Sequence, residues 1–335
     1  MKFKIYYFLL LSIALFSCNK KEEVINPTNE VTVGGQTDQI IEADSVPATV
    51  EEAKKIDYPV FVKPEIGFTQ LVFPKDKKDS VMKIFNDNYN ADERAAILAL
   101  NRLDSKNKGR ADTLVIPAKI DTTLMSYTPF PTQLEILKDV RKFVVFSYPL
   151  QAYGVYANGV LLKWGPTSMG KKSAQTKRGL MFTNWKKKLA ISTVDSEWKL
   201  PYNFNIENHL GIGWHQYDLP GFPASHSCLR LLMKDAQWMY AFGEQWVLTE
   251  GGAKVRAKGI PVIVFGDYGW GKSKPWFALA KDSHANDISV EQMDGIIRPH
   301  LQAMLDAQAE RDRVLKEVEQ EKLMKQDTIK VNPSV

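Results

Sequence analysis

Runs of apolar and polar residues divide the chain into four stretches that differ in their periodicity. Residues 5–16 are mostly apolar, and residues 19–58 are polar, poor in aromatic residues and without sustained periodicity. Residues 66–265 carry short apolar segments at the spacing of helices and strands, and a charged helical pattern follows from Ser289 to about Gln326. This pattern predicts an apolar leader, a flexible linker, a folded body and a C-terminal helix.

Residues 66–118 are predicted to form a small α+β domain. Asp79 and Ser80 precede apolar residues at helical spacing, and Asp92 precedes a second such group. Polar residues of this kind cap helix N-termini, so two short helices are expected. Residues 113–117 then indicate a short strand that ends at Pro117.

The stretch from residue 142 to about residue 265 is predicted to be rich in β-strands. Residues 143–146 and 260–265 are compact apolar segments, and Asn158-Gly159 between two further apolar segments predicts a tight hairpin. Short strands separated by glycine-rich turns favour a β-sandwich with mixed or antiparallel sheets over an α/β sheet.

The C-terminal extension, residues 284–335, is predicted to be helical. Ser289 followed three residues later by Gln292 is the signature of a capping box, and the helical pattern continues past Pro299. Its apolar stripe is thin, which favours a helix packed on its own domain over a coiled coil.

Composition limits the classes of function. The 335 residues are 44% hydrophobic and 25% charged, which supplies enough apolar surface for one large or two modest domains. The net charge is +5, and it falls to +3 without residues 1–17, which contain two lysines and no acid. Because this charge is weak and no basic aromatic motif accompanies it, nucleic acid is not expected as a partner.

The N-terminus predicts export and a lipid anchor. Lys2 and Lys4 precede an apolar run that is too short for a bilayer-spanning helix, which needs about 20 residues, so residues 1–17 indicate a secretion signal. The small residue before Cys18 resembles the lipobox of bacterial lipoproteins, which implies that Cys18 becomes the lipid-bearing first residue. Residues 18–58 would then be the lipidated cysteine and its flexible tether. An ordinary signal peptide with an incidental cysteine is the alternative.

The expected location is therefore the cell envelope, on the periplasm-facing side of the outer membrane, with the membrane contacted through the lipid on Cys18. Residues 20–23, Lys-Lys-Glu-Glu, resemble the surface-export signals of some Gram-negative lipoproteins, so surface exposure is the alternative. The sequence does not determine the oligomeric state.

Cys228 is the strongest candidate for chemistry. It is the only cysteine besides Cys18, so no internal disulfide is available to it in an oxidising compartment. His226 and His215 precede it by two and thirteen residues, and an unpaired thiol near histidines is a candidate nucleophile. An inert buried cysteine is the alternative. Zinc lacks support because no Cys-x-x-Cys or His-Glu-x-x-His spacing is present, so no metal or other cofactor is expected.

Several separated motifs resemble those of the L,D-transpeptidase family with a YkuD-type catalytic domain. In chain order they are Ser168-Met169-Gly170, Thr176-Lys177-Arg178-Gly179, Trp214-His215 and Ser225-His226-Ser227-Cys228-Leu229-Arg230-Leu231. The resemblance implies a mainly β catalytic domain, a YkuD-type β-sandwich with mixed sheets, over residues 127–276. It also implies that Cys228 attacks a peptide carbonyl in peptidoglycan, with His215 as its base and His226 as a further catalytic residue. The substrate-binding residues that it implies are Ser225, Ser227, Arg230 and Gly179.

The chain departs from the family pattern at three positions. Ser227 replaces the glycine usual before the cysteine, Gln216 replaces the glycine after the upstream histidine, and Lys177 replaces a proline. The spacing between His215 and Cys228 is also shorter than expected. A serine unable to adopt a glycine-like backbone would distort the catalytic loop or alter the substrate range.

Residues 66–118 resemble the later part of a LysM glycan-binding module, although the Gly-Asp-Thr-Leu usual at its start is absent. The resemblance implies glycan binding. A structural domain that binds nothing is the alternative, because a fold does not by itself carry a function.

Three functions fit these features. The leading one is an L,D-transpeptidase that forms a thioester with a peptidoglycan stem peptide and passes it to an amine. An L,D-carboxypeptidase or hydrolase would release the same thioester with water. The third is a weakly active lipoprotein that tethers the membrane to the wall. The sequence does not separate the first two, because the choice of acceptor depends on loops.

Overall fold

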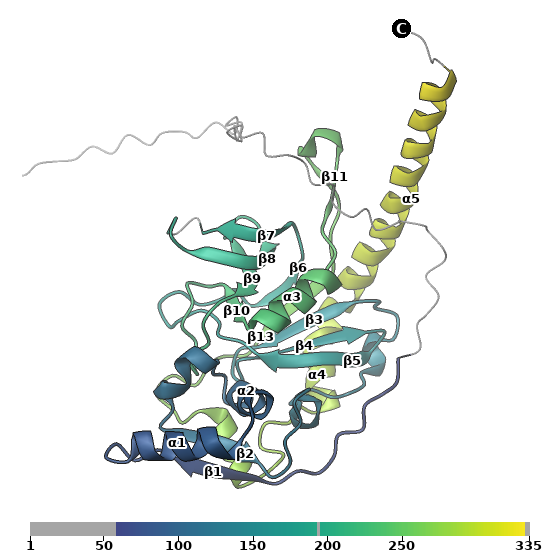
Figure 1. Cartoon of the computed structure of the whole chain (residues 1–335). Coiled ribbons are helices and arrows are strands. Elements are labelled where there is room, and N and C mark those ends of the chain that lie inside the picture. Colours follow the sequence, from purple (N-terminus) through teal and green to yellow (C-terminus); the bar gives the residue numbers. More distant parts are fainter. Residues whose placement is uncertain (1–57, 193–194, 332–335) are drawn as a thin grey trace, which may run out of the picture. The chain divides into compact units, whose positions relative to one another are not determined.

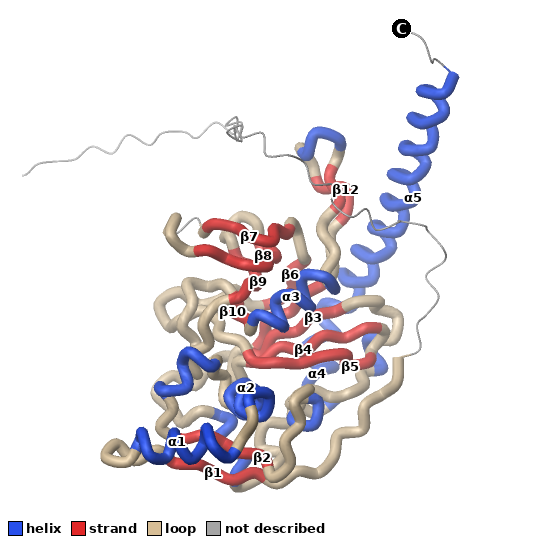
Figure 2. Tube along the Cα trace, viewed as in Figure 1, coloured by secondary structure: helices blue, strands red, loops and turns tan. Residues whose placement is uncertain are grey.

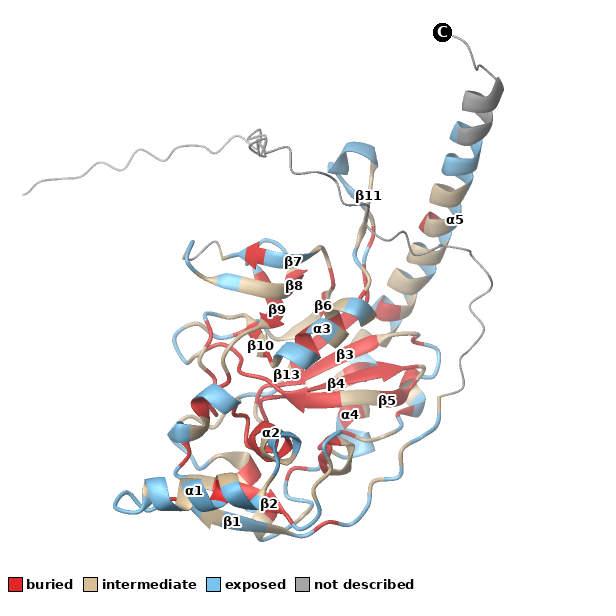
Figure 3. Ribbon diagram, in the orientation of Figure 1, coloured by how far each residue is buried: buried red, intermediate tan, exposed pale blue. Residues whose placement is uncertain are grey.

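The centre of the computed structural model, which describes residues 58–192 and 195–331, is a five-stranded sheet in the order β5-β4-β3-β13-β6 (Figure 1). β13 runs parallel to β3 and the other neighbours are antiparallel, so the sheet is mixed. β3 and β4 are buried along their whole length (Figure 3), because both of their faces are covered. The strands are β3 (Phe143–Ser147), β4 (Ala152–Ala157), β5 (Val160–Pro166), β6 (Gly179–Phe182) and β13 (Pro261–Phe265).

A second sheet has four strands in the order β10-β9-β8-β7. β10 is parallel to β9, and the remaining pairs are antiparallel. One hydrophobic cluster joins the two sheets, and within it the rings of Phe146 and Trp214 lie 6.2 Å apart. The prediction of a mainly β fold with mixed sheets is therefore confirmed. The strands are β7 (Lys186–Ile191), β8 (Lys199–Glu207), β9 (Ile212–Gln216) and β10 (Leu229–Leu231).

The hairpin between β4 and β5 turns at the predicted residues. Asn158 and Gly159 have φ angles of 48° and 80°, as a two-residue turn with both residues in the left-handed region requires. Gly159 also lies against the backbone, since a Cβ there would approach the carbonyl oxygen of Leu134 to 2.4 Å. No larger residue fits this position.

The segment before the five-stranded sheet contains the two predicted helices and the predicted strand. They are α1 (Lys78–Asn88), α2 (Ala91–Leu100) and β2 (Thr113–Pro117), and β2 pairs antiparallel with β1 (Phe68–Val72). α2 begins one residue earlier than Asp92 because Asn90 is its cap. The Asn90 side chain accepts from the backbone N–H of Glu93, and the Glu93 side chain accepts from the backbone N–H of Asn90.

The C-terminal region is helical, as predicted. Ser289 and Gln292 form the expected capping box at the start of α4 (Val290–Ile297), and α5 (Leu301–Val331) follows (Figure 2). The first half of α5 packs on its own domain, where Arg141 donates two hydrogen bonds of 2.7 and 2.6 Å to Asp312. The remaining elements are α3 (Met233–Phe242), β11 (Val247–Leu248) and β12 (Val255–Ala257).

No helix within residues 58–192 and 195–331 combines the length and the apolar character needed to cross a bilayer. The predicted signal segment 1–17, Cys18 and almost all of the predicted tether 18–58 lie outside the described residues.

Candidate active site

The parallel pairing of β9 with β10 brings His215 and Cys228 to the same part of the fold. Arg230 lies opposite His215 in the pairing, and Leu229 lies opposite Trp214. Side chains alternate along strands, and Trp214 and Leu229 are fully buried in the core, so His215 and Arg230 lie on the other face. Strand pairing thus brings His215 close to the strand that begins directly after Cys228.

The Cys228 side chain faces the beginning of β9. Its Sγ lies 3.7 Å from the carbonyl oxygen of Gly211. Burial raises the pKa of the Cys228 thiol, while the backbone N–H of Gly213 and the charge of Arg230 act in the opposite direction. Burial dominates, so the resting side chain is a neutral thiol.

His215 is buried and has one of its ring nitrogens engaged. Its Nδ1 lies 2.9 Å from the carbonyl oxygen of Gln216, which can only accept, so Nδ1 carries the proton and Nε2 is the basic nitrogen. Burial lowers the pKa of His215 to about 4, and the positive charge of Arg230 acts in the same direction. His215 is therefore a neutral base at neutral pH, not the cationic half of an ion pair.

The segment that carries Cys228 is held by hydrogen bonds on both sides. The Ser225 hydroxyl donates to the Cys228 carbonyl oxygen at 2.5 Å, and the Ser225 N–H donates to the carbonyl oxygen of Met169 at 3.0 Å. The Thr176 hydroxyl donates to the Ser227 carbonyl oxygen at 2.9 Å and accepts from the Gly170 N–H at 3.0 Å. Ser225 thus holds the loop of Cys228 from within, and its predicted part in substrate binding stays a prediction.

Thr176 is a positioning residue that the predicted set of site residues did not include. It is buried and connects the Gly170 loop to the Cys228 loop through a single hydroxyl. The sequence signal for Thr176 is its place in the Thr176-Lys177-Arg178-Gly179 motif, of which the resemblance implied only Gly179 as a site residue.

Ser227 has a backbone conformation that glycine adopts more readily than other residues. Its φ is 84°, in the left-handed region that is unfavourable for residues with a Cβ. A residue with a strained backbone therefore lies immediately before Cys228.

Arg230 and Gly179, two of the predicted substrate-binding residues, both have contacts within the protein. The two terminal nitrogens of Arg230 donate to the carbonyl oxygens of Asp218 at 3.3 Å and Ala224 at 3.2 Å, and the guanidinium lies 4.5 Å from the ring centre of Tyr217. Gly179 begins β6 with a φ of 94° and pairs with Val264 of β13. Among the described residues, no hydrogen bond joins Gly179 to the Cys228 segment.

His226 is exposed, and it contacts residues other than Cys228. Its Nε2 lies 2.6 Å from Nζ of Lys171, and its ring centre lies 5.1 Å from that of Trp198. The catalytic role predicted for His226 stays a prediction.

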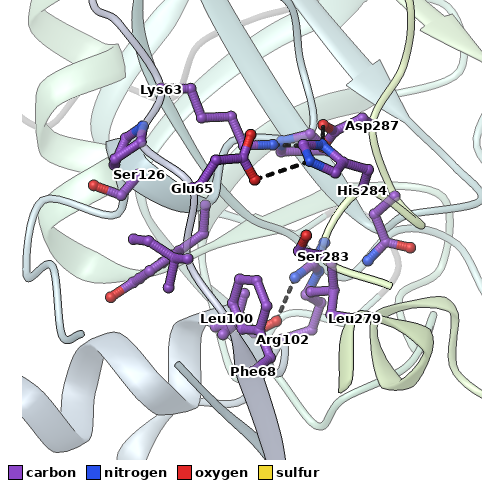
Figure 4. A pocket seen from close by; sticks show the side chains of 15 residues that line it. Lys63, Glu65, Phe68, Leu100, Arg102, Ser126, Leu279, Ser283, His284 and Asp287 are labelled. Atoms are coloured by element: carbon purple, nitrogen blue, oxygen red, sulfur yellow. Dashed lines mark hydrogen bonds and ion pairs between the residues drawn. The ribbon is translucent and has the colours of Figure 1, made fainter. Parts of the chain in front are cut away.

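A recess on the described part of the molecule lies among residues other than those of the Cys228 site (Figure 4). Lys63, Glu65, His284 and Asp287 line it, together with the buried Arg102. Within residues 58–192 and 195–331, no group of three His, Cys, Asp or Glu side chains is arranged to hold a metal ion.

Comparison with known proteins identifies the domain that carries this site. Residues 141–264 match the family model YkuD, the L,D-transpeptidase catalytic domain. The match does not extend to residues 66–118, for which the LysM-like interpretation stays a prediction. No curated protein matches the chain.

Solved structures of L,D-transpeptidases resemble this chain at low sequence identity. One from Stackebrandtia nassauensis is 23% identical, with 38% of this chain and 57% of that chain covered and a TM-score of 0.31. One from Mycobacterium smegmatis is 20% identical, with 38% and 59% covered and a TM-score of 0.30. L,D-transpeptidase 3 from Mycobacterium tuberculosis is 21% identical, with 38% and 61% covered and a TM-score of 0.30. This chain therefore spans less than two thirds of the length of these structures.

Proposed function

Residues 141–264 are a YkuD-type L,D-transpeptidase catalytic domain, and from this premise we propose that the chain is a cysteine-dependent L,D-transpeptidase of peptidoglycan. The observation that carries the proposal is the β9–β10 pairing, which places the buried neutral His215 opposite Arg230, two residues after Cys228. A thiol nucleophile and a base with a free nitrogen are the two groups that acyl transfer through a thioester requires.

The first half-reaction would be acylation of Cys228. Nε2 of His215 takes the thiol proton as sulfur attacks the carbonyl carbon between diaminopimelate and D-alanine in a tetrapeptide stem. The carbon–nitrogen bond then breaks, the proton passes from His215 to the leaving nitrogen, and D-alanine departs. Backbone N–H groups near Cys228 would stabilise the oxyanion, and the stem is left as a thioester.

The second half-reaction would return the thiol. The amine of a second stem attacks the thioester carbonyl, and the carbon–sulfur bond breaks. One proton of the attacking amine passes through His215 to the departing sulfur. An amide cross-link forms, and Cys228 and His215 regain their starting protonation states.

Muropeptide analysis tests the proposal. The detergent-solubilised full chain, incubated with tetrapeptide stems, is expected to give cross-linked dimers and free D-alanine in mass spectra. Cys228→Ser should lose nearly all turnover, and His215→Ala should slow acylation by about 10²- to 10⁴-fold, the usual contribution of a positioned base. The exposed His209→Ala is the matched control and should behave as the wild type.

The same samples discriminate the alternatives. Tripeptides without dimers would indicate a carboxypeptidase, because water would then resolve the thioester. A strained carbapenem lactam offers the same electrophile, so an adduct at Cys228 in intact-protein mass spectra is expected. A folded wild type that gives neither product nor adduct would contradict the enzyme and favour a wall tether.

We also propose that Cys18 is the lipid-bearing mature N-terminus, which would place the chain in the cell envelope. The lipobox-like end of residues 1–17 supports this proposal. Metabolic labelling with a fatty-acid probe should mark the wild type and miss Cys18→Ala, and equal labelling of both would contradict it.

A further inference from the structure

Lys171 forms an unusual contact at the edge of the Cys228 segment. Its Nζ lies 2.6 Å from Nε2 of His226. A lysine ammonium has only donors, so the imidazole nitrogen must accept, and His226 is then neutral with its proton on Nδ1. Partial burial and the charges of Lys171 and Arg230 all lower the pKa of His226, which agrees with a neutral ring. The pair therefore carries one positive charge, on Lys171.

In the described part of the chain, no carboxylate forms an ion pair with Lys171. Lys177 and Arg178 of the same loop pair with Glu207 and Asp267. Among the ion pairs that residues 58–192 and 195–331 form, none includes Lys171. An ammonium held by a neutral imidazole keeps donors for an anion that arrives from solution.

The backbone fixes Lys171 relative to the nucleophile's loop. The Lys171 N–H donates to the Ser225 carbonyl oxygen at 2.8 Å, and the Ser225 N–H donates to the Met169 carbonyl oxygen at 3.0 Å. Ser225 also donates through its hydroxyl to the carbonyl oxygen of Cys228 at 2.5 Å. The Lys171 backbone is therefore joined to the Cys228 segment through hydrogen bonds of Ser225, and a group bound at Lys171 would lie near that segment.

Arg230, which the family resemblance implies as a substrate-binding residue, already has partners within the protein. Its terminal nitrogens donate to the carbonyl oxygens of Asp218 and Ala224, and its plane covers Tyr217. Lys171 is the better candidate to bind a substrate carboxylate, because no ion pair among the described residues includes it. The ring of Trp198 lies beside His226, with 5.1 Å between the ring centres, and adds an apolar surface there.

Building on the proposed function, we infer that Lys171, with His226 and Trp198 beside it, binds the side-chain carboxylate of diaminopimelate in the donor stem. Diaminopimelate supplies the attacked carbonyl and carries a second carboxyl group at the far end of its side chain. A cation tied to the Cys228 loop would orient that residue and would distinguish a free carboxylate from a carboxamide.

Binding to a turnover-blocked chain tests the inference separately from catalysis. In the Cys228→Ser background, the dissociation constants of two tetrapeptide stems are measured by calorimetry. The stems differ only in the side chain of diaminopimelate, which is a free acid in one and an amide in the other. The free acid should bind about tenfold more tightly, the usual scale of one charge-assisted hydrogen bond. The preference should shrink as salt rises.

Three second substitutions locate the effect. Lys171→Met should abolish the preference by weakening binding of the acid while leaving binding of the amide within about twofold, since the amide makes no ion pair. Lys171→Arg should retain the preference. Lys172→Met, at the exposed neighbour, is the matched control and should change neither constant.

Several outcomes would overturn the inference. These are equal binding of the two stems, a preference that survives Lys171→Met, and an equal weakening of both stems by Lys171→Met, which would indicate a purely structural lysine. Turnover by the chain with Cys228 intact decides the proposed function independently. Dimer formation with no difference between the stems in binding would reject the carboxylate site and leave the transpeptidase standing.

Discussion

Ser227 has a φ of 84° immediately before Cys228, and its carbonyl oxygen accepts a hydrogen bond from the Thr176 hydroxyl, which joins two loops of the site. A left-handed backbone costs about 1–2 kcal/mol for a residue with a Cβ. Glycine removes this strain but gains freedom in the unfolded chain worth about 0.5–1 kcal/mol.

Ser227→Gly is therefore expected to raise the free energy of unfolding slightly, by up to about 1 kcal/mol, and to keep or increase turnover. Ser227→Val should lower both, because a β-branched residue tolerates a positive φ least. Thermal unfolding and muropeptide turnover of the three proteins would measure this. Greater stability of the valine variant would show that the loop adopts another conformation.

The protonation state of His215 predicts the acid limb of the activity. Because burial lowers its pKa to about 4, the base stays neutral far below the ordinary histidine value of 6.5. The acid limb of kcat/KM should therefore have its midpoint near pH 4, and a midpoint near pH 6.5 would show that the base is solvated.

Stability must be followed over the same pH range. The unfolded chain protonates His215 at the ordinary pKa of 6.5 and the folded chain only at about 4. The free energy of unfolding therefore falls as the pH drops through this window. Circular dichroism at each pH would separate titration of the base from loss of the fold.

At the scale of elements, hydrogen bonds of His284 join the segment before β1 to the loop before α4 (Figure 4). Its Nδ1 lies 2.8 Å from Asp287 and its Nε2 lies 3.1 Å from Glu65, while Nζ of Lys63 lies 2.5 Å from Asp287. Hydrogen bonds to Asp287 and Glu65 raise the pKa of His284 above 6.5. Only the protonated ring can donate to both carboxylates.

The attachment of residues 63–65 is therefore expected to be complete below pH 6.5 and to weaken as the pH rises through the raised pKa of His284. Hydrogen exchange of this segment, corrected for the intrinsic rate, should be faster at about pH 9 than at about pH 6. His284→Gln should remove the pH dependence, because its amide does not titrate in this range. An unchanged dependence in that variant would assign the effect to another group.

At the scale of the whole molecule, residues 66–118 share their apolar core with the catalytic domain. Ala96, Leu100 and Val115 lie in the same buried cluster as Leu161 and Trp164 of β5. The predicted domain boundaries stay a prediction. The hydrophobic cluster contains buried residues of both segments, 66–118 and 127–276.

Deleting residues 66–118 is accordingly expected to expose this cluster and to destabilise the catalytic domain, with early thermal unfolding and binding of a hydrophobic dye. The intact chain should unfold in one transition when followed by tryptophan fluorescence and by circular dichroism. A deletion variant with the wild-type melting temperature would establish two independent domains. Wall binding by this segment is therefore better tested with surface substitutions than with deletion.

The sequence by itself determined the features that depend on neighbouring residues and on side-chain chemistry. The Asn158-Gly159 turn and the Ser289 cap are local, because a two-residue turn and a helix start are specified within a few positions. The motif around Cys228 was likewise readable, because the thiol and histidine types that acyl transfer needs stand close together in the sequence, and their catalytic roles stay predictions.

Only the tertiary structure decided how these residues meet and which protonation states they hold. The β9–β10 register, the bridging hydroxyl of Thr176 and the contact of Lys171 with His226 join positions far apart in sequence, and no short-range pattern specifies them. Burial also sets the pKa values of His215 and Cys228, since removing a group from water disfavours its charged form. The position of α2 against β5 follows from the same cause, because apolar side chains distant in the chain are driven into one core.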